Sequence, residues 1–142
     1  MRDYFIVTFE DGMPKGTAQQ KGECIRYKFV GDKKVPYVHH FKKNKVSAMR
    51  QILEWKFKVH RPKTPAEGQV RLFIVLYFDT KERAKWGKLK TTRPDLDNWA
   101  KECIDAMVSC GYFKDDALIV DLHIKKYWAE KASIFIDWEE QT

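Results

Sequence analysis

The chain has 142 residues, of which 44% are hydrophobic and 14% aromatic, so it can bury the core of one domain and is not a disordered segment. Its formal net charge of +7 favours an anionic partner, and nucleic acid is the commonest such partner. The charge alone is equally compatible with a basic domain that binds no nucleic acid.

The sequence shows no pattern for secretion, membrane insertion or structural zinc. No signal pattern precedes the first strand-like run, and no apolar stretch approaches the roughly 20 residues of a membrane helix. The three cysteines, Cys24, Cys103 and Cys110, form no CxxC pair, and the four histidines show no metal-ligand spacing. We therefore expect no disulfide framework, no structural zinc site and a reducing, cytoplasmic location.

The N-terminal third predicts two strands separated by a loop. Tyr4–Glu10 is rich in residues that favour strands, and it ends at the turn signal Asp11-Gly12. Residues 12–24 contain glycine, proline and polar side chains, which predict a loop. Ile25–Val30 predicts a second strand, and the polar, basic residues 32–43 are assigned no regular element.

A helix and a long strand come next. Apolar residues at intervals of three and four predict a helix over Val46–Val59, with Arg50, Lys56 and Lys58 facing solvent. The continuous apolar run Val70–Phe78 predicts a central strand that is covered on both faces of its sheet.

The C-terminal half predicts one helix and two strands. The basic segment 81–93 has no clean helical pattern, whereas Asp95–Ser109 predicts a helix that ends before Gly111. Leu118–Tyr127 and Ala132–Trp138 predict two strands that pair as an antiparallel hairpin. The whole chain then forms a single small α+β domain, with two main helices packed on a mixed or antiparallel sheet.

Four carboxylates bracket the second predicted helix. Asp95 and Asp97 lie at its start, and Asp115 and Asp116 lie in the turn that follows it. Lys101 shares a helix stripe with Asp97 because the two are four residues apart. If the helix crosses the sheet, this stripe and the turn can converge. Carboxylates about 4 Å apart would repel by roughly 4 kcal/mol at an effective dielectric constant near 20, so protonation, a basic neighbour or a divalent cation would have to compensate.

A purely carboxylate site suggests a particular chemistry. Carboxylate oxygens without histidine or cysteine partners select hard ions such as Mg²⁺ or Mn²⁺. In a basic protein such an ion points to a phosphodiester substrate, because it can activate water and stabilise the charge that develops on the phosphate. Lys101 is placed to offset carboxylate repulsion or to contact the scissile phosphate.

The same residues also have purely structural explanations. Asp95 can cap the helix N-terminus, and Asp97 can interact favourably with the helix dipole. Asp97, Lys101 and Asp105 can form a solvated charge ladder, and Asp115 with its neighbour can form a polar turn. Spacing alone leaves both explanations open.

The segment RPDLDNWAKECIDAM, followed by GYFKDDALIVDLHIKKY, resembles the RusA-type Holliday junction resolvases, a family common in phages and prophages. The family pattern is roughly D-x-D-N-x-x-K-x-x-x-D-A, then D-D-x-x-[IV]. Its matching positions in this chain are Asp95, Asp97, Asn98, Lys101, Asp105, Ala106, Asp115, Asp116 and Ile119.

The resemblance implies a small α+β homodimer that resolves four-way DNA junctions in recombination and repair, using Mg²⁺ or, as a substitute, Mn²⁺. The site residues that it implies are the catalytic metal ligands Asp95, Asp97 and Asp116, the additional candidate ligand Asp115, and the catalytic Lys101. A dimer also suits such a substrate, because two symmetric nicks need two equivalent sites.

The basic segment before the acidic helix predicts DNA contacts. Its cations can neutralise phosphates without reading bases, and its tryptophan can stack on an unpaired base. The predicted DNA-binding residues are Lys85, Lys88, Lys90, Arg93 and Trp86, and Lys42, Lys43 and Lys45 form a second candidate patch. The structural alternative is a solvated basic loop whose tryptophan packs on the core.

Two other functions are compatible with these residues. One is a nucleic-acid-binding module without catalysis, in which the aspartates only cap and turn the chain. The other is a metal-dependent nuclease that acts on flaps, replication forks or RNA.

Overall fold

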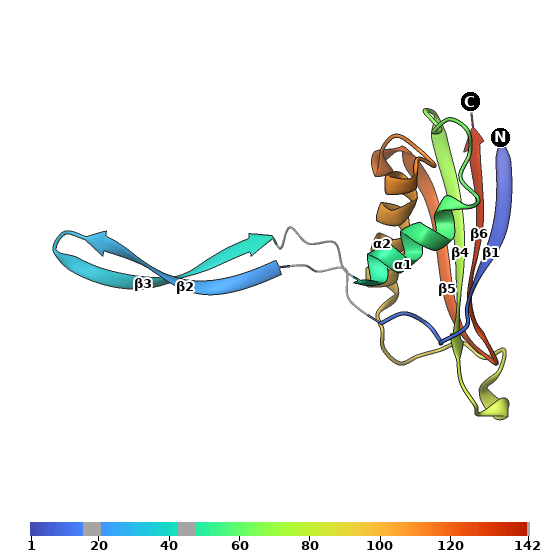
Figure 1. Cartoon of the computed structure of the whole chain (residues 1–142), viewed down its shortest axis with the longest axis horizontal. Coiled ribbons are helices and arrows are strands. Elements are labelled where there is room, and N and C mark those ends of the chain that lie inside the picture. Colours follow the sequence, from blue (N-terminus) through green and yellow to red (C-terminus); the bar gives the residue numbers. More distant parts are fainter. Residues whose placement is uncertain (16–20, 43–47, 142) are drawn as a thin grey trace.

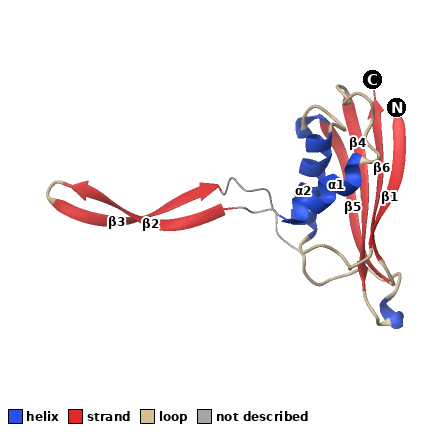
Figure 2. Cartoon of the chain, in the orientation of Figure 1, coloured by secondary structure: helices blue, strands red, loops and turns tan. Residues whose placement is uncertain are grey.

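The computed structural model describes residues 1–15, 21–42 and 48–141, with the backbone alone at 21–24 and 40–42. It shows a body, made of a four-stranded sheet with two helices on one face, and a two-stranded hairpin that projects from it (Figures 1 and 2). The predicted α+β class with two main helices is therefore confirmed. None of the helices in the described part of the chain is long and apolar enough to cross a membrane.

The body's sheet is mixed and has the strand order β1-β6-β4-β5. Its strands are β1 (Arg2–Phe9), β4 (Gln69–Asp79), β5 (Ile119–Ala129) and β6 (Ala132–Gln141). β6 pairs antiparallel with both β1 and β4, whereas β5 pairs parallel with β4. β4 is thus an interior strand, as its apolar sequence predicted.

The prediction that β4 is covered on both faces is wrong. Leu72, Ile74 and Leu76 are buried under the helices, because successive side chains of a strand point to opposite faces. Phe73 and Tyr77 point to the other face and are only half-buried. A hollow of about 510 Å³ lies on that open face, beside these two rings.

The predicted hairpin between the last two strands is also wrong, since β4 lies between β5 and β6. The chain passes from β4 through the second helix into β5, and such a crossover connects parallel strands. The two-residue connection Glu130-Lys131 then passes the end of β4, and β6 pairs on its opposite side.

The second sheet consists of β2 (Lys21–Val30) and β3 (Lys33–Lys42), paired antiparallel. β2 begins inside the segment predicted as a loop, and β3 occupies residues that were assigned no regular element. Ile25, Tyr27 and Phe29 lie on one face of this hairpin and are 67%, 58% and 72% exposed. The side chains described in the hairpin, at residues 25–39, therefore bury no core of their own.

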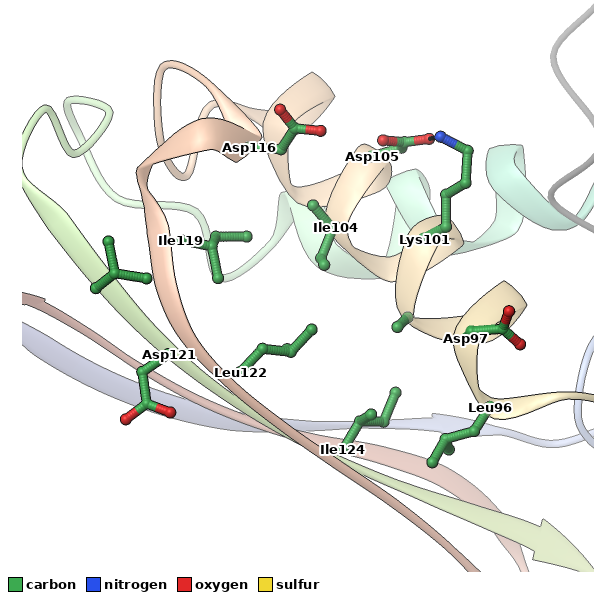
Figure 3. Close-up of a pocket in the computed structure, with 12 residues that line it drawn as sticks. Leu96, Asp97, Lys101, Ile104, Asp105, Asp116, Ile119, Asp121, Leu122 and Ile124 are labelled. Carbon is green, nitrogen blue, oxygen red and sulfur yellow. Dashed lines mark ion pairs between the residues drawn. The ribbon is translucent and has the colours of Figure 1, made fainter.

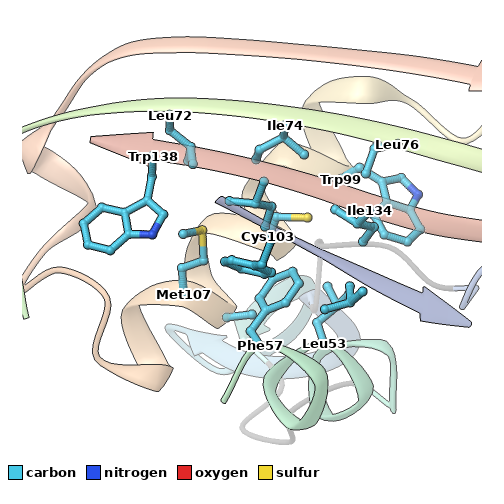
Figure 4. Close-up of a cluster of buried hydrophobic side chains, with 14 of the residues drawn as sticks. Leu53, Phe57, Leu72, Ile74, Leu76, Trp99, Cys103, Met107, Ile134 and Trp138 are labelled. Atoms are coloured by element: carbon cyan, nitrogen blue, oxygen red, sulfur yellow. The ribbon is translucent and has the colours of Figure 1, made fainter. Parts of the chain in front are cut away.

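The two helices supply the other half of the body's core (Figure 4). α1 (Ala48–Lys58) buries Leu53 and Phe57, and α2 (Leu96–Cys110) buries Cys103 and Met107 against the sheet. Fully burying a side chain of this size stabilises the fold by roughly 1.5–3 kcal/mol. Gly111 ends α2 as predicted, with a left-handed φ of 87° and its amide bonded to the last helical turn.

The predicted stripe of α1 is correct only in part. Met49 and Leu53 are buried, but Ile52 and Val59 are 39% and 78% exposed. The predicted start of this helix, from residue 46, lies outside the described residues. Arg50 was predicted to face solvent, but this is wrong, because it forms ion pairs with Glu102 and Asp105 of α2.

Candidate active site

A cavity of about 860 Å³, which we call the acidic cavity, lies between α2 and the outer strand β5 (Figure 3). Apolar side chains of both elements line its floor. Its polar groups are Asp97, Lys101 and Asp105 of α2, Asp116 of the turn before β5, and Asp121 of β5. The helical spacing of four places the first three on one side of α2, as predicted.

The turn before β5 is a short 3₁₀ helix, Asp116–Leu118, with Asp115 at its N-cap. The carboxylate of Asp115 accepts a hydrogen bond from the amide of Ala117 at 3.2 Å, and this bond lowers the pKa of Asp115. The carboxyl group of Asp116 is hydrogen-bonded to that of Asp115, which raises the pKa of Asp116. Burial and repulsion from Asp115 and Asp105 raise it further, against Lys101. Asp115 therefore shapes the turn, while Asp116 lines the cavity.

Asp105 is neutralised by two cations. The guanidinium of Arg50 lies 2.9 Å from Asp105 and 2.7 Å from Glu102, which is almost fully buried. The ammonium of Lys101 lies 3.6 Å from the same Asp105 oxygen. Because Arg50 already compensates Asp105, the 61%-exposed side chain of Lys101 remains able to meet a second anion.

Asp95 does not line the acidic cavity. It is the N-cap residue of α2, but its side chain makes no capping hydrogen bond. The residue lines a second cavity, of about 530 Å³, together with Asp79, Arg93 and Asn98. The sequence-based explanation of its carboxylate as a helix cap is therefore wrong, since that carboxylate does not bond to the helix.

The donor set of the acidic cavity consists of carboxylates, which suits hard cations such as Mg²⁺. Within the described part of the chain, however, no three His, Cys, Asp or Glu side chains are gathered closely enough to hold a metal ion. The structure places Asp97 and Asp116 in one cavity and Asp95 in the other. Their joint coordination of one ion remains a prediction.

The basic segment runs along the outer edge of β5. The amide of Gly87 donates a hydrogen bond to Trp128 O, and the amide of Trp128 donates one to Lys88 O. The indole of Trp86 donates to Thr80 O at 2.9 Å and is half-buried. This contact agrees with the alternative in which the tryptophan packs on the protein.

The five predicted DNA-binding residues differ in exposure. Lys85, Lys88 and Arg93 are exposed, although Lys85 lies 3.0 Å from Glu82. Lys90 is only 6% exposed, so its ammonium is not presented to a phosphate. The second candidate patch lies outside the described side chains.

Sequence reasoning missed two groups of the site. Arg50 belongs to α1 but forms an ion pair with Glu102 of α2. Its sequence neighbours, such as Glu54 four residues later, do not indicate this partner. Lys126 lies in β5 but hydrogen-bonds to the backbone carbonyls of Thr92 and Pro94 at 2.8 Å each. A local pattern carries no signal for either contact.

Comparison with known proteins gives two relatives. The chain is 35% identical over 139 residues to the crossover junction endodeoxyribonuclease rusA of Lactococcus phage r1t, covering 96% of this chain and 98% of the relative. It is also 35% identical over 86 residues to the uncharacterized protein YqaN of Bacillus subtilis (strain 168), covering 53% of this chain and 60% of that protein.

The family comparison agrees with the acidic motif. Residues 12–139 match the protein family described as Endodeoxyribonuclease RusA. This range contains both helices and, of the body's sheet, β4, β5 and most of β6. The resemblance inferred from the two acid clusters is confirmed over most of the chain. The chain belongs to the RusA endodeoxyribonuclease family.

Proposed function

We propose that this chain is a Mg²⁺-dependent endodeoxyribonuclease that resolves four-way DNA junctions by paired symmetric nicks. The observation that carries the proposal is the acidic cavity, in which Asp97 and Asp116 flank an exposed lysine in a protein of net charge +7. The phage relative, named as a crossover junction endodeoxyribonuclease and matched over almost its full length, supports the same substrate.

The carboxylates are proposed to hold the cation. Asp97 and Asp116 are the central ligands, Asp95 completes the set, and Asp115 is the additional candidate. When bound, the ion would supply a more acidic water and stabilise negative charge on the phosphate. The raised pKa of Asp116 supports this assignment, because the hydrogen bond with Asp115, and then the repulsion from Asp115 and Asp105, come from neighbouring carboxyl groups.

Lys101 is proposed to contact the scissile phosphate. Its ammonium is mostly exposed and lies on the same helix face as Asp97. The Arg50 guanidinium bonds to Glu102 and Asp105, so the acidic face of α2 does not depend on Lys101 alone for compensation. A lysine held beside a carboxylate can meet an incoming phosphate as a compact point charge.

The exposed cations of the basic segment are proposed to position the duplex arms. Lys85, Lys88 and Arg93 precede α2 directly and can neutralise phosphates without reading sequence. A homodimer would present two such sites, related by a two-fold axis, to the symmetric junction. The reducing cytoplasm expected from the cysteine content is where we propose that the enzyme works.

The test is a panel of labelled substrates, namely four-way junctions, flaps, forks, duplexes and RNA, incubated with Mg²⁺, Mn²⁺ or EDTA. The proposal predicts that junctions are preferred and nicked in symmetric pairs, and that EDTA abolishes nicking while junction binding persists. Binding without nicking in any metal would instead indicate the non-catalytic module. Preferential cleavage of flaps, forks or RNA would identify the other nuclease class.

A single substitution tests the site within that panel. Asp97→Asn should slow junction cleavage at least about 100-fold, because a lost metal contact removes several kcal/mol of transition-state stabilisation. Glu130→Gln, in the exposed turn between β5 and β6, is the matched control and should cleave at the wild-type rate. Near-wild-type turnover by Asp97→Asn would refute the assignment of the acidic cavity.

A further inference from the structure

Lys90 is a buried cation to which the proposed reaction assigns no role. Its ammonium donates hydrogen bonds to Thr92 Oγ1 at 2.5 Å, to Arg93 O at 2.6 Å and to Thr92 O at 3.3 Å. All three donors of a lysine ammonium can therefore be satisfied by two adjacent residues. Hydrogen bonds with a charged donor are stronger than neutral ones, so these contacts hold the loop firmly.

A second lysine, on β5, also hydrogen-bonds to this loop. Lys126 of β5 donates to Thr92 O and to Pro94 O, both at 2.8 Å. The backbone carbonyls of three successive residues, Thr92, Arg93 and Pro94, are thus turned towards two ammonium groups. We call these three residues the 92–94 loop.

The surroundings of Lys90 make its burial costly. Its ammonium lies 4.2 Å from the ring centre of Trp128 and 5.4 Å from that of Phe78. Burial lowers the pKa of Lys90, and repulsion from Lys126 and Lys85 lowers it further. A buried charge is unfavourable unless it is paired and hydrogen-bonded, and here loop carbonyls and aromatic rings replace a carboxylate partner.

The base of Lys90 is fixed as firmly as its tip. Its amide donates to Lys126 O at 3.0 Å, and this bond attaches the basic segment to the edge of β5. The 92–94 loop therefore runs from an anchored strand edge directly into Asp95. Because the Asp95 side chain makes no capping hydrogen bond to α2, the place of its carboxylate depends on the backbone that leads into it.

We propose that Lys90, assisted by Lys126, is a positioning residue of the active site. Its ammonium fixes the 92–94 loop and thereby the direction of the Asp95 carboxylate at the start of α2. This inference rests on the proposed function, in which Asp95 is a catalytic ligand. It separates Lys90 from the neighbouring exposed lysines, which would act on the DNA itself.

Lys90→Met is the principal variant, because it keeps the length of the side chain and removes the charge. Single-turnover cleavage of a four-way junction should slow roughly 10- to 100-fold, as is typical when a partner that orients a catalytic ligand is lost. The dissociation constant for the junction in EDTA should change less than about twofold, as for substitutions away from an interface. The slope of log affinity against log salt should stay unchanged.

Lys88→Met provides the contrast in binding, since Lys88 lies two residues away and is exposed. Its loss should weaken junction binding and reduce the salt slope by about one, as expected for one phosphate contact. Lys131→Met, in the exposed turn between β5 and β6, is the control and should match the wild type in both assays. A Lys90→Met protein that behaves like Lys88→Met in binding overturns the positioning role.

Two further variants keep the test decisive if Lys90→Met folds poorly. Lys126→Met removes the outer lysine and should slow cleavage in the same direction without altering the salt slope. In an Asp95→Asn background, Lys90→Met should add little further loss, because both changes act on one carboxylate. Independent, multiplying losses would show that Lys90 does not act through Asp95.

The outcomes distinguish this inference from the function on which it rests. A wild-type chain that cleaves no junction overturns both. A wild-type chain that cleaves junctions, with Lys90→Met and Lys126→Met variants that cleave them equally fast, overturns only the positioning role.

Discussion

In the body, alternate side chains of β4 are buried beneath two helices, whereas the corresponding side chains of the β2–β3 hairpin are exposed. Leu72 and Ile74 are at most 2% exposed, but Tyr27 and Phe29 are 58% and 72% exposed. Both segments have strand-forming sequences and regular antiparallel pairing. The difference shows that pairing alone does not make a core, and that a two-stranded hairpin is marginally stable without a layer to cover it.

The proposed catalytic groups all belong to the body. Asp97 and Lys101 lie on α2, which buries Cys103 and Met107 on its opposite side. Rigid elements hold side chains more precisely than loops do, so α2 holds the side chains of the acidic cavity in well-defined positions. The hairpin, in contrast, offers exposed cations and aromatic rings, such as Lys34 over the ring of Tyr27 at 4.6 Å.

Amide hydrogen exchange should show the largest difference between the two regions. The amides of β4 and β6 should open only with global unfolding, at about 5–10 kcal/mol, and those of β2 and β3 at less than about 2 kcal/mol. Exchange measured by NMR or mass spectrometry on the isolated protein tests this. Equal protection in both regions would mean that the hairpin is covered in solution.

A pair of phenylalanine substitutions sharpens the comparison. Phe57→Ala removes a fully buried ring between α1 and the sheet, and should lower the free energy of unfolding by about 3–5 kcal/mol. Phe29→Ala, its counterpart in the hairpin, should change it by less than about 0.5 kcal/mol. Urea denaturation followed by tryptophan fluorescence measures both. A similar cost for the two variants would contradict the division into body and hairpin.

Arg50→Met tests the ion pairs that join the two helices of the body. Its loss leaves the buried Glu102 carboxylate without its cation and should cost about 3 kcal/mol of unfolding free energy. Replacing both partners, as in Arg50→Met with Glu102→Leu, should recover most of that loss, because no unpaired charge then remains buried. Failure of the double variant to recover stability would show that packing, not charge, dominates this contact.

The smallest expected effect concerns the turn before β5. Asp115→Ala removes the carboxyl group that bonds to and repels Asp116, so the pKa of Asp116 should fall. At a pH between the two values, more of Asp116 is then ionised in the variant than in the wild type. Carbon-detected NMR titration without divalent cations measures this directly. An unchanged Asp116 pKa would show that Asp115 is not what raises it.

Local patterns in the sequence were sufficient for α2 and its acidic face. The four-residue spacing of Asp97, Lys101 and Asp105 is a property of one helix, and the two acid clusters led to the family that the comparisons confirm. The position of β5 and β6 was not predictable in this way. Alternating apolar residues indicate a strand, but the partner depends on the crossover through α2, which is a long-range property.

Lys90 shows the same limit for a single side chain. A lysine among other cations is predicted to lie on the surface, because lysines are almost never fully buried unless they are paired. Its partners are backbone carbonyls of the 92–94 loop, and carbonyl direction leaves no mark in the residue types. The same limit applies to the structural alternative for Asp95, since its residue type suits a cap that its side chain does not make.

The strand order β1-β6-β4-β5 has a consequence for synthesis of the protein. β1 leaves the ribosome before the other described strands, yet its only sheet partner among them is β6, with Arg2 opposite Glu139. Contacts this distant in sequence form slowly, because a long loop must close before they contribute. A nascent chain that has not reached Ala132 therefore leaves β1 unpaired and one edge of β4 open, so the sheet of the body can assemble only after β6 has been made.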